Sequence, residues 1–322
     1  METVSKRNYT LDFVKGIACI CVVLMHCEFP GYLGTLVQCV SRFCVPFFFM
    51  ISGYFCFKND RIVNYKNKIK HIAIITLFAT LFYLIIAVIG GNISFSFKGL
   101  LFWLVFNQPI IIAGQMWFLF ALLYDYILFG LTEKLKLTKY TAYALPVCLV
   151  MYIALAQGAH LFGISVPNMI YRNFLVEGLF FFSLGYWIHR KEDKLKFSNK
   201  LLIAVLVITT LLCPVERLIM GRDFGVNIMT FPQVTALFLL CLNNADKFRK
   251  SRLTVLGNRY SLYVYVLHPA IWHSLEKVYA VLNIGDNIIA MYCMPLLCVA
   301  FAILVSILTY QFISLIPKRK KV

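Results

Sequence analysis

Residues 11–27 read LDFVKGIACICVVLMHC, and this stretch decides the fold class of the chain. It is apolar, and its length suits a helix that crosses a membrane, which takes about 17 to 25 residues. It nevertheless carries an acid, a base and an imidazole at Asp12, Lys15 and His26. At about 100° per residue, Lys15 and His26 project from one helix face about 16 Å apart, and Asp12 lies one turn before Lys15. The stretch therefore predicts a membrane helix with functional polar groups.

The composition of the whole chain is that of an integral membrane protein. Of its 322 residues, 61% are hydrophobic and only 14% are charged, which is too apolar for the surface of a water-soluble protein of this size. We predict an all-α bundle of about ten transmembrane helices that forms a single domain over residues 1–322. The ten predicted spans are roughly 11–28, 35–57, 71–90, 111–130, 140–157, 172–189, 200–215, 226–243, 256–275 and 287–316.

The basic residues indicate the topology. Most of them lie in alternate connections between the predicted spans, namely 58–70, 131–139, 190–200 and 247–259, or at the two ends, as Lys6, Arg7 and Lys318 to Lys321. Basic connections stay in the cytoplasm, so both termini are predicted to be cytoplasmic. Because the basic residues are confined to short connections between apolar spans, the net charge of +17 does not indicate a nucleic-acid partner. No metal site is predicted, because the 11 cysteines are scattered without zinc-ligand spacing.

Polar side chains recur at comparable depth in several predicted spans. Ionisable groups in lipid-spanning helices are costly, so they face a protein interior and pair with one another. We interpret His26 as a proton-exchanging group and Arg42 as a permanent cation that needs a polar or anionic partner. The other polar residues at this predicted depth are Gln115, Trp117, Glu177 and His268.

Several of these residues have a simpler structural reading. Trp117 suits an interfacial anchor, and Glu177 is balanced between a structural and a functional role. For Arg172 we expect either a satisfied interhelical hydrogen bond or a side chain that snorkels from the end of its span to the interface. Asp125, near the inner end of its predicted span, is expected to cap the helix or to pair with a loop lysine. Residues 91–110, which are rich in Phe and Trp, suit an interfacial or re-entrant segment.

The polar residues sit in an ordered set of motifs: RNYTLDFVKGIACICVVLMH (7–26), SRFCVPFFFMISGYF (41–55), MWFLFALLY (116–124), RNFLVEGLFFFSLGYWI (172–188) and LGNRYSLYVYVLHP (256–269). This set resembles the acyltransferase-3 family, bacterial ten-helix membrane proteins that move acyl groups onto cell-envelope sugars. Lys15 stands where arginine is commoner in the family. In YKNKIKH (65–71), lysines stand where many members have an arginine pair.

The resemblance implies a membrane O-acyltransferase of the bacterial cytoplasmic membrane, with acyl-CoA as co-substrate, no permanently bound cofactor and an envelope glycan as acceptor. We expect His26 to act as general base or to carry the acyl group briefly, and Arg42 to stabilise developing negative charge. The catalytic prediction comprises His26, Arg42 and Glu177. The donor-binding prediction comprises Asp12, Lys15, Lys66, Lys68 and Lys70. The acceptor-side prediction comprises Gln115, Trp117 and His268.

Two other function classes stay open on the sequence. The same polar residues suit a transporter or exporter that makes no covalent bond, and the chain also resembles the membrane portions of serine-racemase-like proteins, whose expected role is transport. The lack of clear inverted repeats makes this class less favoured. A membrane sensor or assembly partner would explain the topology without explaining the ordered polar set. A homo-oligomer is left open.

Overall fold

The computed structural model describes residues 7–57, 65–91, 97–107 and 114–315, and within these ranges the chain is helical, without a β-strand. Seven helical stretches are long and apolar enough to cross a membrane, and each corresponds to one of the predicted spans. The all-α membrane class is therefore confirmed. The seven stretches are Tyr9–His26, Gly31–Tyr54, Tyr65–Ile89, Gly114–Lys134, Thr138–Leu161, Asn199–Met220 and Ile288–Leu315.

Three predicted spans are helical but do not meet this length and hydropathy requirement. The sixth is a π-helix, η5 (Phe174–Gly178), that continues as α9 (Leu179–Arg190), and the eighth is the 14-residue α11 (Thr230–Asn243). The ninth is the π-helix η7 (Leu256–Tyr260) followed by α13 (Ser261–Val281). The count of ten spans and the cytoplasmic position of both termini stay predictions. Of the basic residues behind that topology, Lys6, Lys58, Arg61 and Lys318 to Lys321 lie outside the described residues.

The chain forms two compact units, each assembled from separate stretches of sequence. Unit 1 comprises Met1–Cys44, Ser198–Arg217 and Met229–Val322, and unit 2 comprises Val45–Phe197 and Leu218–Ile228. The helices of unit 1 are α1 (Tyr9–His26), α2 (Gly31–Ser41), most of α10 (Asn199–Met220), α11, α12 (Arg252–Val255), η7, α13 and α14 (Ile288–Leu315). The helices of unit 2 are α3 (Cys44–Tyr54, from Val45), α4 (Tyr65–Ile89), α5 (Phe97–Phe106), η1 (Gly114–Met116), α6 (Trp117–Lys134), η2 (Thr138–Tyr140), α7 (Thr141–Ile153), η3 (Ala154–Gly158), α8 (Ala159–Leu161), η4 (Asn168–Ile170), η5, α9 and η6 (Glu192–Lys194).

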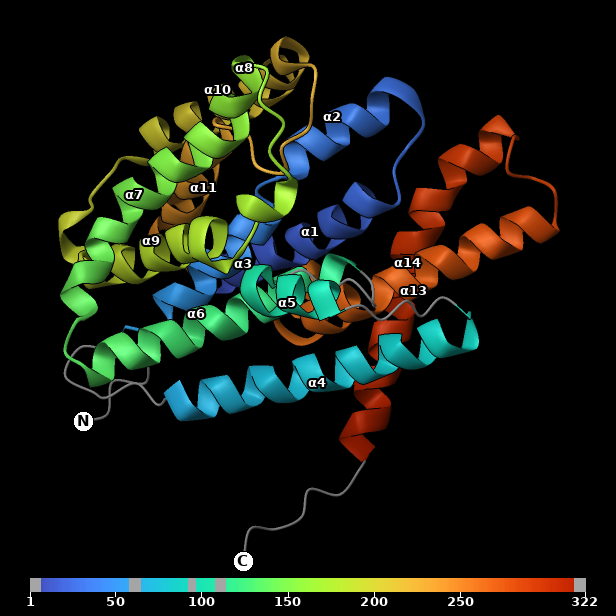
Figure 1. Ribbon diagram of the computed structural model, residues 1–322, viewed down its shortest axis with the longest axis horizontal. Coiled ribbons are helices and arrows are strands. Elements are labelled where there is room, and N and C mark those ends of the chain that lie inside the picture. Colours follow the sequence, from blue (N-terminus) through green and yellow to red (C-terminus); the bar gives the residue numbers. More distant parts are fainter. Residues whose placement is uncertain (1–6, 58–64, 92–96, 108–113, 316–322) are drawn as a thin grey trace, which may run out of the picture. The chain divides into compact units, whose positions relative to one another are not determined.

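In unit 1, α1 is the central helix. It packs against α12, η7, α13 and α14, which follow more than 200 residues later in the chain (Figure 1). Close approach depends on glycine: a Cβ at Gly16 would overlap the Leu253 carbonyl oxygen, and one at Gly257 would overlap the Asp12 carbonyl oxygen. Helix interfaces in membranes use small residues in this way, because backbones then come near enough to pack. The contact brings η7 to the end of α1 that carries Asp12 and Lys15.

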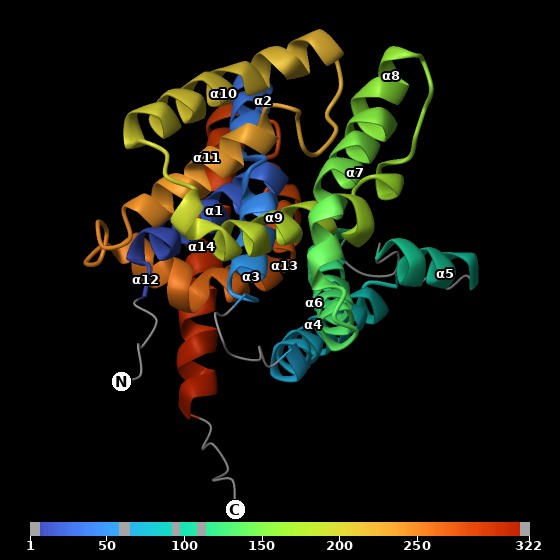
Figure 2. The same cartoon turned by 90° about the vertical axis from the view of Figure 1, so that its left-hand side faces the viewer.

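The helices α10 and α11 lie side by side in the same unit (Figure 2). The Gln233 side-chain amide donates a hydrogen bond to the Thr210 hydroxyl at 3.0 Å, and the thiol of Cys213 lies near Gln233 and Thr230. These polar side chains belong to otherwise apolar helices. Interhelical hydrogen bonds of this kind fix helix register inside a membrane.

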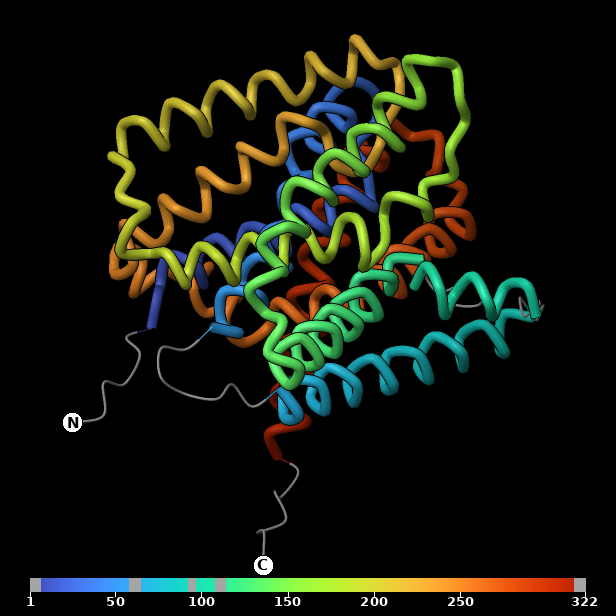
Figure 3. Tube along the Cα trace, turned by 60° about the vertical axis from the view of Figure 1, so that its left-hand side comes forward, coloured from blue at the N-terminus to red at the C-terminus, as the bar shows by residue number. Residues whose placement is uncertain are grey.

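In unit 2, the long helix α4 runs alongside α6, and α7 runs alongside α9 (Figure 3). The π-helix η5 contacts α6, α7 and α9, so it lies at the meeting point of three helices. A π-turn is wider than an α-turn and is often found at functional sites. This segment carries Glu177, and its surroundings are described below.

Candidate functional site

The donor-side residues predicted on α1 form an ion-pair cluster. The Lys15 ammonium lies 3.6 Å from one carboxylate oxygen of Asp12, which confirms the pairing predicted across one turn. The Arg7 guanidinium, which the sequence analysis did not select, lies 2.7 Å from the other oxygen. Helix α1 begins here because the Asn8 side chain accepts a hydrogen bond from the Leu11 amide at 2.9 Å, as an N-cap residue does. Asp12 therefore holds two cations at the start of the helix.

At the other end of α1, His26 meets the second predicted histidine. The His26 and His268 rings are stacked, with centroids 5.3 Å apart and planes 25° apart. His268 is completely buried, and its Nδ1 lies 2.8 Å from the carbonyl oxygen of Tyr265. Because a carbonyl oxygen only accepts hydrogen bonds, Nδ1 is the donor, and the second ring nitrogen is Nε2. That Nε2 is buried and has no hydrogen-bond partner among the described residues.

Arg42 occupies a break in the second predicted span. The sequence predicted one helix over 35–57, whereas α2 ends at Ser41 and α3 begins at Cys44, with Arg42 as the C-cap of α2. A break frees backbone carbonyl groups from the helical ladder, and a cation is favourable at a helix C-terminus. The predicted span is therefore present as Gly31–Tyr54, with a short interruption of the helix at Arg42 and Phe43.

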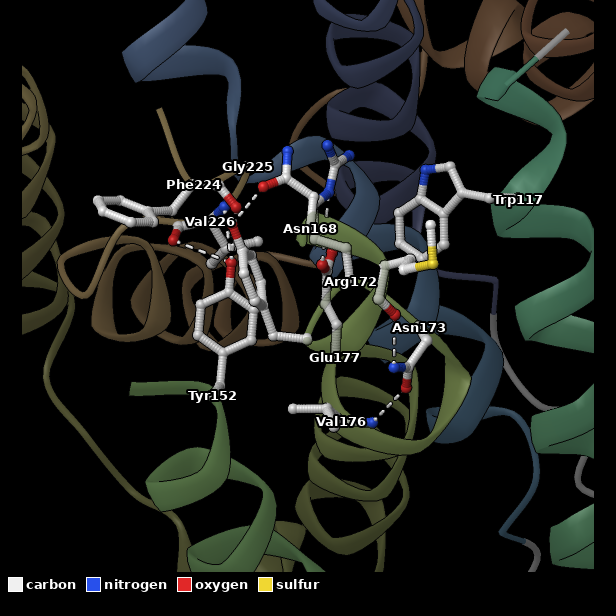
Figure 4. Close-up of polar contacts among 12 residues, drawn as sticks. Trp117, Tyr152, Asn168, Arg172, Asn173, Val176, Glu177, Phe224, Gly225 and Val226 are labelled. Carbon is white, nitrogen blue, oxygen red and sulfur yellow. Dashed lines mark hydrogen bonds and ion pairs between the residues drawn. The ribbon is translucent and has the colours of Figure 1, made fainter. Parts of the chain in front are cut away.

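In unit 2, two predicted residues come together around an arginine. The Arg172 guanidinium carbon lies 5.3 Å from the centre of the Trp117 ring, and its Nε lies 3.9 Å from a carboxylate oxygen of Glu177 (Figure 4). Glu177 and Trp117 are buried, while a quarter of the Arg172 side chain is exposed. Arg172 thus forms the centre of this cluster, beside the Glu177 carboxylate and the Trp117 ring, and its interhelical hydrogen bond stays a prediction.

Asparagine side chains fix the positions of Trp117 and Glu177. Asn107 donates to the Trp117 carbonyl oxygen at 3.1 Å and accepts from the Phe174 amide at 2.8 Å, which joins the start of α6 to η5. Asn173 caps η5 by accepting from the Leu175 and Val176 amides (Figure 4). Sequence reasoning did not find Asn107, because it lies in a connection without a recognisable motif. Gln115 lies in the short turn η1, just before Trp117.

The connection that follows α10 contains Gly225, which lies directly against the Arg172 side chain. The Tyr152 hydroxyl accepts from the Val226 amide at 3.0 Å and donates to the carbonyl oxygens of Phe224 and Val226, both at 3.1 Å (Figure 4). This anchors Gly225, whose φ of +88° favours glycine. A Cβ at Gly225 would lie 2.6 Å from both Cδ and Nε of Arg172.

Gly225→Ala is therefore expected to displace the Arg172 side chain and to lower the free energy of unfolding by about 1 to 3 kcal/mol, since overpacking is added to backbone strain. Thermal unfolding in detergent measures the stability, and the fluorescence of Trp117, with the other tryptophans replaced by phenylalanine, reports the position of Arg172. The matched control is Gly163→Ala, because Gly163 also has a positive φ of 72° but has no atom near a new Cβ. Equal effects of the two substitutions would contradict the displacement.

The predicted lysine cluster is not a single group. Residues 65–71 form the first turns of α4 rather than a loop. Lys66 and Lys70 share an exposed face, because four residues make about one turn. Lys68 lies on the opposite face, half-buried, with its ammonium 5.5 Å from the centre of the Tyr126 ring. The three lysines therefore do not all lie on one face of α4, and their role in donor binding stays a prediction.

The expectation for Asp125 was also wrong. Asp125 neither caps a helix nor pairs with a loop lysine: it is completely buried, and neither carboxylate oxygen has a hydrogen-bond partner in the described part of the chain. It packs against η5, where a Cβ at Gly178 would lie 2.6 Å from Oδ2. A buried carboxyl group without a hydrogen-bond partner is costly in such surroundings.

Within the described ranges, no group of three or more His, Cys, Asp or Glu side chains is arranged to hold a metal ion. The predicted site residues instead form separate clusters. Unit 1 contains the Asp12–Lys15 pair, Arg42 and the histidine pair, and unit 2 contains the cluster of Trp117, Arg172 and Glu177.

Two known proteins are similar in sequence to parts of this chain. An amino-acid racemase of Enterococcus faecalis is 28% identical over 318 residues, which cover 86% of this chain and 43% of the relative. A serine/alanine racemase of Enterococcus gallinarum is 33% identical over 102 residues, which cover 28% of this chain and 15% of the relative. The chain thus spans less than half the length of these two relatives. No solved structure matches it.

The family assignment rests on a match over nearly the whole chain. The profile of the acyltransferase-3 family, described as an acyltransferase domain, matches residues 8–311. These residues run from the N-cap of α1 into the last turns of α14 and include both histidines and the cluster around Arg172. The chain therefore belongs to the acyltransferase-3 family of membrane acyltransferases.

Proposed function

We propose that the protein is an O-acetyltransferase of a bacterial cytoplasmic membrane. It transfers the acetyl group of cytoplasmic acetyl-CoA to a hydroxyl group of an extracytoplasmic cell-envelope glycan. The observation that carries the proposal is the stacked pair of His26 and His268 inside a family of acyltransferases. Histidine is the side chain best suited to move a proton near neutral pH, and the two rings lie where α1 packs against α13.

In this proposal His26 is the general base. One of its ring nitrogens takes the proton of the acceptor hydroxyl while that oxygen bonds to the thioester carbonyl carbon, which gives a tetrahedral oxyanion. The carbon–sulfur bond then breaks, the thiolate leaves, and the proton held by His26 passes to the sulfur, so that the products are the acetyl ester and free CoA. Arg42 stabilises the oxyanion, because a guanidinium is always charged and donates several hydrogen bonds.

The hydrogen bonding of His268 supports a positioning role. Its Nδ1–H is committed to a backbone carbonyl of its own helix, so the ring orientation is fixed. The stacked contact then restrains the rotation of the His26 ring. Restricting a catalytic side chain to a productive orientation lowers the entropic part of the barrier.

The remaining predicted residues keep separate assignments. Lys15, held by Asp12, contributes positive charge for the donor. In unit 2 we assign Trp117, Gln115 and the Arg172–Glu177 pair to recognition of the acceptor, since guanidinium and carboxylate groups hydrogen-bond to sugar hydroxyls. In this assignment Glu177 is a binding residue that orients Arg172, because its carboxylate is buried beside that guanidinium.

The test uses purified protein in sealed proteoliposomes that contain an envelope glycan. Radiolabelled acetyl-CoA is added outside, and the enclosed glycan is recovered and treated with mild base, which releases ester-linked acetyl groups. We expect label on the glycan only in vesicles that contain the protein. Unlabelled glycans, obtained with folded protein and a panel of acceptors, would overturn the proposal.

A second candidate function is transport of a small polar molecule without covalent chemistry. It is favoured by Asp125, because buried carboxyl groups in membrane helices are common in proton-coupled carriers. The two relatives described above are named as racemases of amino acids, which suggests serine and alanine as trial substrates. Uptake of labelled, chemically unchanged amino acid into the same proteoliposomes, driven by a pH gradient, would support this function.

A further inference from the structure

Two arginines that are far apart in the sequence lie close to one aromatic ring of unit 1. The Arg7 guanidinium carbon lies 5.2 Å from the centre of the Tyr9 ring, and the Arg249 guanidinium carbon lies 5.3 Å from the same centre. Both side chains are exposed, and Tyr9 is half-buried. We call Arg7, Tyr9 and Arg249 the arginine cluster.

Hydrogen bonds join the backbone around the arginine cluster to the end of α11 and the turn that follows it. The Tyr9 amide donates to the Ala245 carbonyl oxygen at 2.7 Å, and the Asn8 side chain donates to the Cys241 carbonyl oxygen at 3.1 Å. Next to them, the rings of Phe13 and Phe248 stack with centroids 4.0 Å apart and planes 11° apart. The start of α1 and the turn after α11 are thus joined, and the two guanidinium groups extend from these joined segments to the Tyr9 ring.

The joined segments have more positive charge than their own carboxylates neutralise. Asp12 is engaged by Arg7 and Lys15, and Arg249 has no carboxylate partner within the described ranges. Lys247 lies beside the same turn, with its ammonium 5.8 Å from the centre of the Phe248 ring. Cations held this close together repel one another, and a polyanionic ligand relieves that repulsion.

We propose that the arginine cluster binds the phosphate groups of the nucleotide end of acyl-CoA. This inference rests on the proposed function, and it places the donor's phosphates on unit 1 rather than on the lysines of α4. Two guanidinium groups offer the forked donor geometry that suits phosphate oxygens, which lysine lacks. Lys15 lies on the same helix about two turns further along, so the cluster marks the donor-binding end of α1.

An anionic lipid headgroup has related chemistry and is the competing occupant. Lipid attraction needs only diffuse positive charge near the membrane surface. The cluster differs, because its guanidinium groups share the ring of Tyr9, whose own backbone is hydrogen-bonded to the turn that carries Arg249. Such a preorganised pair favours a ligand with several phosphates on one molecule.

The test measures equilibrium binding of CoA, which has no acyl group and cannot turn over, to the purified protein in nanodiscs of zwitterionic lipid. We expect Arg7→Gln and Arg249→Gln each to weaken binding by about ten-fold or more, as expected for the loss of a charge-assisted hydrogen bond. Arg249→Lys should retain only part of the affinity. The matched control is Lys250→Gln, which removes the neighbouring positive charge and should change the affinity by about two-fold or less.

The outcomes separate this inference from the proposed function. If wild-type protein binds CoA and the two glutamine variants bind it equally well, the arginine cluster is not the site, and the proposed function stands. If folded wild-type protein binds no CoA, both the site and the donor of the proposed reaction are wrong. If the variants lose binding only to anionic vesicles and not to CoA, the ligand is a lipid headgroup and the inference is overturned.

Discussion

Replacing His26 by alanine is expected to lower the rate of acetyl transfer by about two to four orders of magnitude, the range that a positioned general base contributes. The substitution removes the ring that stacks on His268 and, in the proposed mechanism, the nitrogen that accepts the hydroxyl proton. The measurement is the rate of ester formation in the proteoliposome assay. Donor binding should be retained, because the arginine cluster lies at the opposite end of α1.

The control for this experiment is His273→Ala. His273 lies on α13, as His268 does, but it is exposed and its Nδ1 lies 2.8 Å from a carboxylate oxygen of Glu276. Its loss should leave the rate unchanged. Thermal unfolding in detergent establishes that both variants are folded. A His26→Ala protein that is folded and fully active would remove His26 from the chemistry.

Gly257→Ala is expected to have the largest effect on stability. A Cβ at this position would overlap the Asp12 carbonyl oxygen and would lie 2.5 Å from the Gly16 amide nitrogen and 2.9 Å from the Lys15 Cβ. Two of these three atoms belong to the backbone, so η7 and α1 must separate. We expect the free energy of unfolding to fall by about 3 kcal/mol or more, at or beyond the upper end of ordinary overpacking. Thermal unfolding of the purified protein measures the change.

The matched control is Gly285→Ala in the same unit, where a new Cβ meets no atom within 4 Å. That substitution should leave the unfolding temperature nearly unchanged. CoA binding by any remaining folded Gly257→Ala protein should also weaken, because the displaced part of α1 carries Lys15. Wild-type stability of Gly257→Ala would show that η7 and α1 are not packed as the structure describes.

The sequence predicted well what depends on one helix. The Asp12–Lys15 pair and the placement of Lys15 and His26 on α1 follow from helical periodicity, and the structure confirms the pair and the helix. The stacking of His26 on His268 follows from no local rule, because the two residues are 242 positions apart in the chain. The predicted topology placed the two histidines at a similar depth in the membrane. Their contact depends on how α1 packs against α13.

Contacts between helices account for what the sequence did not predict. The placement of Arg172 over Trp117 depends on how α6 and η5 pack, and Gly225 reaches them from a third segment. The start of α4 was predicted six residues too late, because its first turns are rich in lysine. As a result, the sequence did not predict that Lys68 lies on the helix face opposite Lys66 and Lys70.

Most of the helices that pack against α1 are synthesised much later than α1 itself. Apart from α2, the helices that contact α1 most extensively begin at residue 230 or later. The ribosome therefore delivers α1 to the membrane long before the segments that cover its polar residues exist. Until α13 and α14 are inserted, Asp12, Lys15 and His26 face lipid, water or the insertion machinery. A chain that stalls before residue 230 would therefore present these polar groups to membrane quality control.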